Sequence, residues 1–353
     1  MSHIVGVRRA LPDNYYDQQT LIAALKRYWG TRHHNVERLA AMHEKVMVGG
    51  RHLALPIDAY ETLESFGQAN QAFIDLGTEL GTRALQLALE AADLSPEAID
   101  HLFFVSVTGV ATPSLDARIV NRLGLRPDIK RTPIFGLGCV AGAAGIARAH
   151  DYLRGHPDGV AALISVELCS LTLQRQDLSV ANIIASGLFG DGAAAVLMVG
   201  PEHPLAANAV GPQVGPTRSV FYPNTEGVMG WDISESGFRV VLSADVPRVA
   251  REHIGADVDA FLQEQGLRRA NIDRYVCHPG GPKVLEAFRD SLAVSDADLA
   301  YTWKTLRELG NLSSASVLMV LEDTMADAPP TGSSGLMVAM GPGFCSEVVL
   351  LRW

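Results

Sequence analysis

The stretch that decides the fold is Phe135-Gly136-Leu137-Gly138-Cys139-Val140-Ala141-Gly142. An apolar run ends in a glycine-rich turn, which is followed by a cysteine and an Ala-rich segment. Glycine permits tight turns and close backbone approach, so the pattern predicts a strand, a turn and then a helix. Cys139 would lie at the helix N-terminus, where the helix dipole favours a thiolate. Cys139 is therefore a candidate nucleophile, and the alternative is a buried structural cysteine.

A dinucleotide-binding loop is a second interpretation of the same glycines. Gly136, Gly138 and Gly142 give a GxGxxxG spacing, whereas the fingerprint is GxGxxG. The fingerprint also needs an acidic residue at a strand end about 20 residues later. Asp151 and Asp158 fall in or just after the predicted helix, so the spacing disfavours a nucleotide cofactor.

Short apolar runs alternate with longer helical stretches on both sides of this turn, which predicts an α/β fold with a parallel or mixed sheet covered by helices. The predicted strands are Leu102–Val107, Thr132–Phe135, Val160–Val166, Ala193–Val199, Phe238–Leu242, Arg274–Cys277, Leu336–Met340 and Val348–Leu351. The predicted helices are Ser114–Leu123, Ala141–Leu153, Val246–Gln265, Pro282–Leu292 and Leu312–Met325. The first hundred residues are predicted to be mostly helical, over Thr20–Tyr28, Asn35–Val46 and Gln68–Ala92.

The length of 353 residues suffices for two domains, at roughly 100–200 residues per domain. The segment Gly200–Thr217 is rich in proline and glycine and is the best candidate for a junction. We therefore predict an N-terminal half over residues 1–205, which carries Cys139, and a C-terminal half over residues 206–353.

Composition excludes several classes of protein. Hydrophobic residues make up 48% of the chain and charged residues 19%, which is typical of a folded protein with a sizeable core. The formal charge of −10 argues against non-specific nucleic-acid binding, which needs a basic surface. The four cysteines form no CxxC pair and no zinc-ligand spacing, so no disulfide scaffold or metal site is expected. Because neither a signal peptide nor an apolar span of about 18 residues is found, we expect a soluble cytoplasmic protein.

Two further polar residues stand where predicted elements end or begin. His278 follows the strand Arg274–Cys277 and precedes Pro279-Gly280-Gly281-Pro282, and strand ends are where α/β sites lie. It is a candidate partner for the Cys139 nucleophile, with a satisfied structural histidine as the alternative. Asn311 opens a predicted helix, and its alternative role is that of helix N-cap.

Two aromatic residues lie in glycine-rich loops. Phe189 stands between Gly187 and Gly190, just before a predicted strand, and in isolation core packing is its better interpretation. Phe344 closes the loop Gly341-Pro342-Gly343-Phe344, whose plain interpretation is a hairpin turn.

Taken in order, these segments resemble the type III polyketide synthases, the chalcone synthase family of the thiolase superfamily. The resemblance covers the chain from about residue 100 to its end, and the first hundred residues fit more loosely. The motifs that carry it are Phe135–Gly142, Leu188–Ala195, Cys277–Pro282, Gly310–Ser314 and Gly341–Phe344. The family implies a thiolase-like fold of two related α/β halves, with mixed sheets and helices layered between and around them, and a homodimer.

The resemblance implies a catalytic triad of Cys139, His278 and Asn311. Cys139 would take an acyl group from an acyl-CoA starter, and His278 and Asn311 would stabilise the enolate left when malonyl-CoA loses CO₂. Iterative condensation and cyclisation to a pyrone or resorcinol-type product would follow, with no cofactor besides the CoA substrates. Phe189 and Phe238 match the family's two gatekeepers between the CoA tunnel and the cavity, and the terminal loop adds Phe344 to the predicted substrate-binding residues.

CoA is polyanionic, so its tunnel needs basic residues despite the negative net charge. The resemblance implies that Arg38 and Lys45 bind CoA, although a solvated helix face is the alternative for both and the third family position is Ala41. Lys283, after the turn that follows His278, is a further candidate for a phosphate contact.

The chain departs from the plant enzymes at the predicted pocket. Thr112 stands where they carry a Met that enters the partner subunit's cavity. Cys169 replaces a pocket Thr, with a structural cysteine as an equal alternative, and Thr172 aligns with another pocket Thr. Because Thr112 and Cys169 are small, a deep acyl tunnel is a hypothesis. The segment Arg218–Asp232 resembles the bacterial branch, within which alkylpyrone and alkylresorcinol synthases are the nearest.

Three alternatives remain open within the same superfamily. A ketoacyl-ACP synthase III usually shows Asn rather than Gly shortly after its His, and His278-Pro279-Gly280-Gly281 speaks against it. An HMG-CoA synthase needs an additional general-acid Glu near the cysteine, which we cannot place in the sequence. A non-catalytic acyl-CoA-binding protein is disfavoured by the joint presence of Cys139, His278 and Asn311.

Overall fold

The computed structural model describes residues 1–29 and 36–353. Within helices, the side chains of Tyr28, Val36 and Arg38 lie outside this description. Among the described residues no helix is long and apolar enough to cross a membrane.

A nine-stranded mixed sheet runs through the molecule in the order β11-β12-β13-β8-β1-β7-β6-β4-β5. In that order the strands are Arg274–Cys277, Ser334–Gly341, Cys345–Arg352, Gln213–Phe221, Ser2–Ala10, Asp191–Val199, Val160–Leu168, His101–Val105 and Lys130–Ile134. β1 pairs with β7 on one side and with β8 on the other, so the first strand of the chain joins the two halves. β4 is parallel to β5 and β6, and β11 is parallel to β12, while the other pairs are antiparallel.

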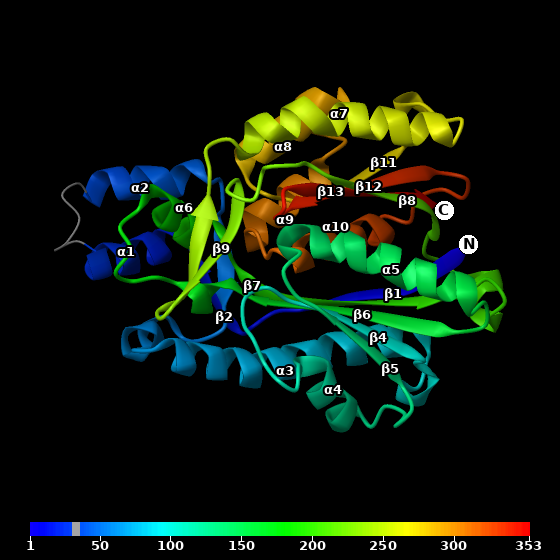
Figure 1. Cartoon of the computed structure of the whole chain (residues 1–353), viewed down its shortest axis with the longest axis horizontal. Coiled ribbons are helices and arrows are strands. Elements are labelled where there is room, and N and C mark those ends of the chain that lie inside the picture. The colour runs from blue at the N-terminus through cyan, green and yellow to red at the C-terminus, as the bar shows by residue number, and fades with distance from the viewer. Residues whose placement is uncertain (30–35) are drawn as a thin grey trace.

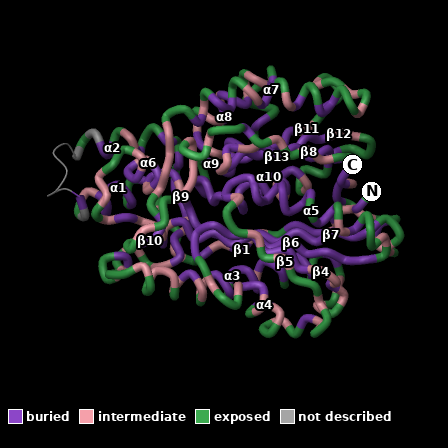
Figure 2. The backbone as a smooth tube through the Cα atoms, viewed as in Figure 1, coloured by how far each residue is buried: buried purple, intermediate pink, exposed green. Residues whose placement is uncertain are grey.

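Helices form three layers around the two parts of this sheet (Figure 1). α5 (Ala141–Gly155) and α10 (Ser314–Ala326) lie between the two parts, and one buried apolar cluster surrounds them. α3 (Phe66–Ala92) and α4 (Leu115–Leu123) cover the outer face of the N-terminal strands, and α7 (Val246–Glu264) and α8 (Pro282–Leu292) cover the C-terminal strands. Figure 2 shows the central helices and strands as the buried part of the molecule.

The remaining elements gather at one end of these layers, near the N-termini of α5 and α10 (Figure 1). They are α1 (Gln18–Trp29), α2 (Val36–Lys45), α6 (Val180–Leu188), α9 (Ala300–Leu309), β2 (Asn14–Asp17), β3 (Gly50–Leu53), β9 (Met229–Ser234) and β10 (Gly237–Leu242). β9 and β10 pair as an antiparallel hairpin, and β2 pairs with β3.

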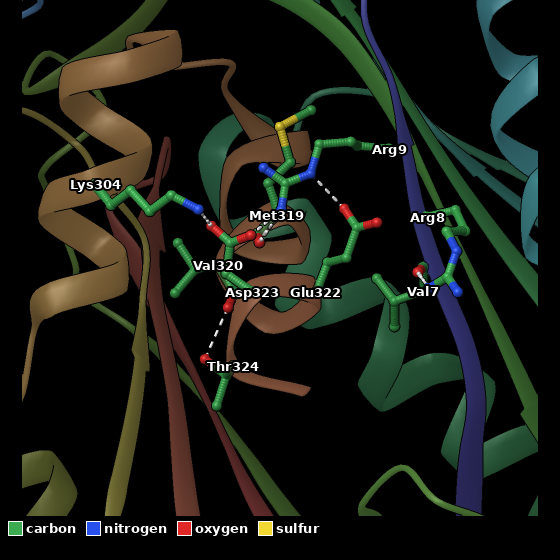
Figure 3. Close-up of polar contacts among 9 residues, drawn as sticks. All are labelled: Val7, Arg8, Arg9, Lys304, Met319, Val320, Glu322, Asp323 and Thr324. Atoms are coloured by element: carbon green, nitrogen blue, oxygen red, sulfur yellow. Dashed lines mark hydrogen bonds and ion pairs between the residues drawn. The ribbon is translucent and has the colours of Figure 1, made fainter. Parts of the chain in front are cut away.

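Charged groups tie the first strand to the C-terminal helices (Figure 3). Arg9 of β1 donates hydrogen bonds to Glu322 and Asp323 of α10, and to the carbonyl of Met319 at 3.1 Å. Lys304 of α9 pairs with the same Asp323 at 3.1 Å. The shared carboxylate therefore holds three elements from the two ends of the chain together.

The predicted α/β thiolase-like fold is confirmed. The helices predicted in the first hundred residues are found as α1, α2 and α3, but β1 was not predicted and occupies the middle of the central sheet. The candidate junction Gly200–Thr217 includes the start of β8 at Gln213. The predicted helix over Asn35–Val46 begins within the described residues at Val36, and Asn35 itself lies outside them.

Candidate active site

Cys139 lies in a short 3-10 turn, Gly138–Val140, that leads directly into α5. Gly138 has φ +57, and a Cβ at this position would lie 2.7 Å from Pro342. A Cβ at Gly341 would lie equally close, 2.7 Å, to the carbonyl oxygen of Leu137. The terminal loop thus packs backbone to backbone against the cysteine turn, which explains why both motifs are rich in glycine.

The N-termini of α5 and α10 converge on Cys139. A Cβ at Gly142 would lie 2.2 Å from the carbonyl oxygen of Ser314, so only glycine lets the two helices approach this closely. The Cys139 Sγ lies 3.7 Å from the Oγ of Ser313, the residue before α10. The side chain of Asn311 also lowers the pKa of this thiol. The positive ends of two helices therefore face one sulfur atom.

Burial opposes the thiolate that the sequence predicts. Cys139 is 5% exposed, and desolvation raises the pKa of its thiol to about 12, while the hydrogen bonds from Ser313 and Asn311 act in the opposite direction. The sequence argument considered only the helix dipole, which is worth about 0.3–1 kcal/mol at a helix end. The desolvation of a fully buried anion outweighs that contribution.

His278 directly follows β11, at the end of the strand where the sequence predicts a site. Its side chain is 3% exposed, and within the described residues neither ring nitrogen has a hydrogen-bond partner. Burial lowers the pKa of this imidazole to about 3, so the ring is neutral at physiological pH. A buried polar ring with two unsatisfied nitrogens is costly unless another group engages it. It is therefore not the satisfied structural histidine of the alternative interpretation.

Asn311 is held by the backbone of the loop that carries Phe189. Its N–H donates to the Leu188 carbonyl at 2.9 Å, and its carbonyl accepts from Gly190 N–H at 3.0 Å. The side-chain Oδ1 accepts from Ser313 N–H at 2.8 Å. Its Nδ2 donates to the Gly280 carbonyl at 3.4 Å, two residues beyond His278. Because Ser313 is the N-cap position of α10, Asn311 does not cap that helix itself.

Glu167 is a buried carboxylate beside this site that the sequence reasoning missed. It lies in β6, is fully buried, and accepts hydrogen bonds from the Val107 N–H at 3.1 Å and the Thr108 hydroxyl at 2.9 Å. It also accepts from the Ser314 hydroxyl at the start of α10. Burial raises the pKa of this carboxyl and these hydrogen bonds lower it. An acidic residue inside the strand Val160–Leu168, whose other residues are apolar apart from Ser165, was the available signal.

A small cavity, here called the cysteine cavity, opens at Cys139. Its lining includes Cys139, Cys169, Phe189, Trp231, Val240 and Ser313. A second space, here called the inner chamber, shares Cys169, Phe189, Trp231 and Val240 with it. The inner chamber extends to α1 and β3, and Thr172 also lines it. The inner chamber therefore borders the cysteine cavity, on which the deep-tunnel hypothesis depends.

A third space of about 1340 Å³, here called the outer hollow, lies on the other side of Phe189. It shares Phe189 and Met229 with the cysteine cavity, and Leu242 also lines both. Two exposed lysines, Lys45 at the end of α2 and Lys283 in the first turn of α8, line the hollow. The predicted contact of Arg38 lies outside the described side chains.

Three predicted pocket residues lie elsewhere in this chain. Phe238 packs edge-on against Phe66, with ring centroids 5.5 Å apart, and lines a different hollow from those around Phe189. Val240, two residues along the same strand, lines the cysteine cavity instead. Phe344 is 1% exposed and belongs to the C-terminal core, while Thr112 is exposed. The places of Phe238 and Val240 depend on how the β9–β10 hairpin packs against the rest of the molecule, which local sequence does not specify.

Profiles of one family match both parts of the chain. The N-terminal domain of chalcone and stilbene synthases matches residues 1–202, and the C-terminal domain of the same family matches residues 214–353. The 1,3,6,8-tetrahydroxynaphthalene synthase of Streptomyces peucetius subsp. caesius is 50% identical over 351 residues, which cover 99% of this chain and 93% of that protein. A putative chalcone synthase of Bacillus subtilis (strain 168) is 34% identical and covers 100% of this chain and 99% of its own length.

The same likeness holds in three dimensions. The crystal structure of 1,3,6,8-tetrahydroxynaphthalene synthase from Streptomyces coelicolor A3(2), a bacterial type III polyketide synthase, superimposes with a TM-score of 0.92. The two chains are 30% identical, and the match covers 99% of each. The likeness therefore extends over the first hundred residues, where the sequence motifs fit loosely.

Proposed function

This chain belongs to the chalcone and stilbene synthase family and is a malonyl-CoA-dependent type III polyketide synthase, and from that premise we propose that Cys139 carries the growing acyl chain. Its Sγ attacks the carbonyl carbon of an acyl-CoA starter. The C–S bond to CoA breaks, CoA leaves as a thiol with the proton of Cys139, and an acyl thioester remains on the enzyme.

His278 and Asn311 are proposed to act on the second substrate. Malonyl-CoA loses CO₂, and the electron pair of the broken C–C bond becomes an enolate whose oxygen accepts N–H donors from the imidazole and the amide. The enolate carbon attacks the thioester on Cys139, which releases the sulfur and leaves a chain that is two carbons longer on CoA. Return of this chain to Cys139 permits the next extension.

The observation that carries this proposal is the unsatisfied imidazole of His278. Both of its buried ring nitrogens lack a partner in the described part of the chain. The neutral ring provides one N–H donor. The Asn311 side chain lies near the segment that carries this ring, because its Nδ2 donates to the carbonyl of Gly280, two residues after His278. The side chain of Asn311 is itself fixed through its Oδ1, so its amide is oriented before substrate arrives.

CoA is proposed to bind in the outer hollow. Lys45 and Lys283 supply positive charge at its rim, and the mostly apolar lining fits the pantetheine arm. Phe189 would then stand between the CoA side and the cysteine cavity, which both contain it. We propose further that the active form is a homodimer in the cytoplasm, where reducing conditions keep the four free cysteines as thiols.

Relatives with identities of 50% and 30% are named for 1,3,6,8-tetrahydroxynaphthalene, whose ten ring carbons correspond to five two-carbon units. We propose a product of this kind, built from malonyl units with no alkyl starter. The second candidate is an alkylpyrone or alkylresorcinol from a fatty acyl starter, because most of the residues lining the inner chamber are apolar.

A mass-spectrometric product screen tests both candidates. Purified protein is incubated with malonyl-CoA alone, and with malonyl-CoA plus acetyl, hexanoyl, long-chain or aromatic acyl-CoA. We expect an unsubstituted aromatic polyketide from malonyl-CoA alone. Products only with a long-chain starter would replace this proposal by the second candidate, and a single condensation without ring closure would contradict both.

A further inference from the structure

Arg51 is a buried arginine that has no ionic partner among the described residues. It lies in β3, its side chain is 3% exposed, and it lines the inner chamber. The guanidinium donates to the Gln18 Oε1 at 2.7 Å, to the Gly187 carbonyl at 2.8 Å and to the Ser186 carbonyl. Within the described residues its Nε–H has no hydrogen-bond partner, and no carboxylate oxygen lies within 4.0 Å of the group.

The nearest acidic group is already engaged elsewhere. Asp191 attracts Arg51 only from beyond ion-pair distance. Its oxygens accept from the Ala54 N–H at 2.6 Å, from the Ser170 N–H at 2.8 Å and from the Ser170 hydroxyl. Burial raises the pKa of Asp191 to about 6, and it lowers the pKa of Arg51 only to about 10, so the guanidinium remains charged at pH 7.

A buried charge is normally neutralised by a partner, because desolvation without one is expensive. Arg51 donates only to neutral oxygens, and the other polar residues that line the inner chamber are also neutral, namely Tyr60, Ser170, Thr172, Asn182 and Ser186. The chamber borders the cysteine cavity, because Cys169, Phe189, Trp231 and Val240 line both spaces. An acyl chain on Cys139 that passes between these side chains would extend toward this cation.

We propose that Arg51 is a specificity residue that binds a carboxylate at the far end of the chain held on Cys139. The proposal rests on the function proposed above and names its starter class: an acyl group that itself ends in a carboxylate, so that the extended chain keeps a carboxylate at its far end. The free Nε–H and the guanidinium charge match a carboxylate oxygen, and an alkyl end would leave both unsatisfied. Arg51 thereby favours carboxylate-ended chains over neutral chains of the same length.

The test uses a matched pair of thiol reagents, 6-iodohexanoate and 6-iodohexanamide. Each forms a C–S bond with Cys139 and releases iodide, and the two differ only in the charge of the distal group. Rates are measured on the full chain by intact-protein and peptide mass spectrometry. We expect wild type to be alkylated preferentially by the carboxylate, and Arg51→Met to lower the ratio of the two rates by at least about tenfold, the size expected of one charge-assisted hydrogen bond. Arg51→Lys should keep part of the preference.

Two controls separate binding from a merely structural role. Arg175 also donates to main-chain carbonyls, those of Glu61 and Leu63, so Arg175→Met removes the same charge and similar contacts outside the inner chamber and should keep the ratio. The short pair iodoacetate and iodoacetamide should show no dependence on Arg51.

The outcomes separate this inference from the proposed function. Equal alkylation rates of wild type with the two long reagents would overturn the inference, and this result does not depend on whether the variant folds. An equal fall of both rates in Arg51→Met would also overturn it. Because alkylation needs no polyketide synthesis, absence of malonyl-derived product would refute the proposed function while leaving this ratio to decide the role of Arg51.

Discussion

Cys139 and Cys277 are both buried thiols, and burial raises the pKa of each to about 12. Cys277 lies within β11, burial is the only cause of its shift, and apolar side chains of the C-terminal core surround it. Cys139 lies where α5 and α10 begin, with Ser313 and Asn311 at the sulfur and a cavity beside it. The two cysteines thus share burial and differ in everything that supports chemistry.

The comparison shows that burial does not identify a nucleophile. What distinguishes Cys139 is a set of groups aimed at one point: two helix N-termini, an amide and a hydroxyl that can stabilise negative charge, and space for an acyl group. Cys277 has the same desolvation with none of these groups. Exchanging or removing individual groups can therefore show how much each contributes.

Removal of the thiol itself should have the largest effect. We expect Cys139→Ala to lower product formation to below about one ten-thousandth of wild type, because no other group can carry the acyl chain. Cys277→Ala is the matched control, and it should keep product formation within a few-fold while the free energy of unfolding falls by about 1 kcal/mol. Product yield by mass spectrometry and denaturant unfolding measure the two quantities. Continued condensation in Cys139→Ala would refute the mechanism.

Removal of an amide donor should have the next largest effect. Asn311→Ala is expected to lower malonyl-CoA decarboxylation by about 10²–10³-fold, the usual cost of one oxyanion donor, and His278→Gln should act on the same step. Release of CO₂ from labelled malonyl-CoA measures this step without chain extension. Ser313→Ala, which removes a hydroxyl beside the same sulfur, should lower decarboxylation much less. Equal decarboxylation rates in wild type, Asn311→Ala and His278→Gln would remove the enolate role.

The residues of this site could be predicted from sequence because their constraints are local. A strand end, a glycine turn and a helix start are encoded within Phe135–Gly142 and Cys277–Pro282. Asn311 was predicted by resemblance, since its position depends on pairing with the distant Phe189 loop. The rest depends on contacts between segments that are far apart in sequence.

The features that could not be predicted from the sequence depend on such long-range contacts. β1 carries Arg8 and Arg9 and does not look like a central strand, yet its pairing with β7 and β8 and the acidic residues of α10 accommodate it. The place of Phe238 depends on how the β9–β10 hairpin packs against the rest of the molecule. Burial of Arg51 contradicts the usual exposure of arginine and follows only from the tertiary fold.

The neutral imidazole of His278 should make stability depend on pH. Its pKa is about 3 in the folded protein and about 6.5 in the unfolded chain, so below pH 6.5 the unfolded state binds the extra proton. The free energy of unfolding therefore falls as pH decreases, by about 2 kcal/mol from this residue between pH 7 and pH 5. Denaturant unfolding of wild type and His278→Gln at the two pH values isolates the contribution. The exposed His156→Gln is the control. An unchanged pH dependence in His278→Gln would show that folding does not lower the pKa of this ring.

The smallest expected effect is a difference between Cys139 and Cys277 in the pH at which each thiol begins to react. This difference comes from the two helix N-termini beside Cys139. Two helix N-termini beside one sulfur atom together stabilise the thiolate by about 1–2 kcal/mol, which lowers the pKa of the thiol by roughly one unit. The rate of iodoacetamide labelling should therefore begin to rise about one pH unit lower for Cys139 than for Cys277. The pH dependence is read separately for each cysteine by peptide mass spectrometry, so a constant difference in access between the sites does not move it. Coincident pH profiles would mean that desolvation cancels the helix ends completely, and that Cys139 becomes a thiolate only when substrate brings new groups to it.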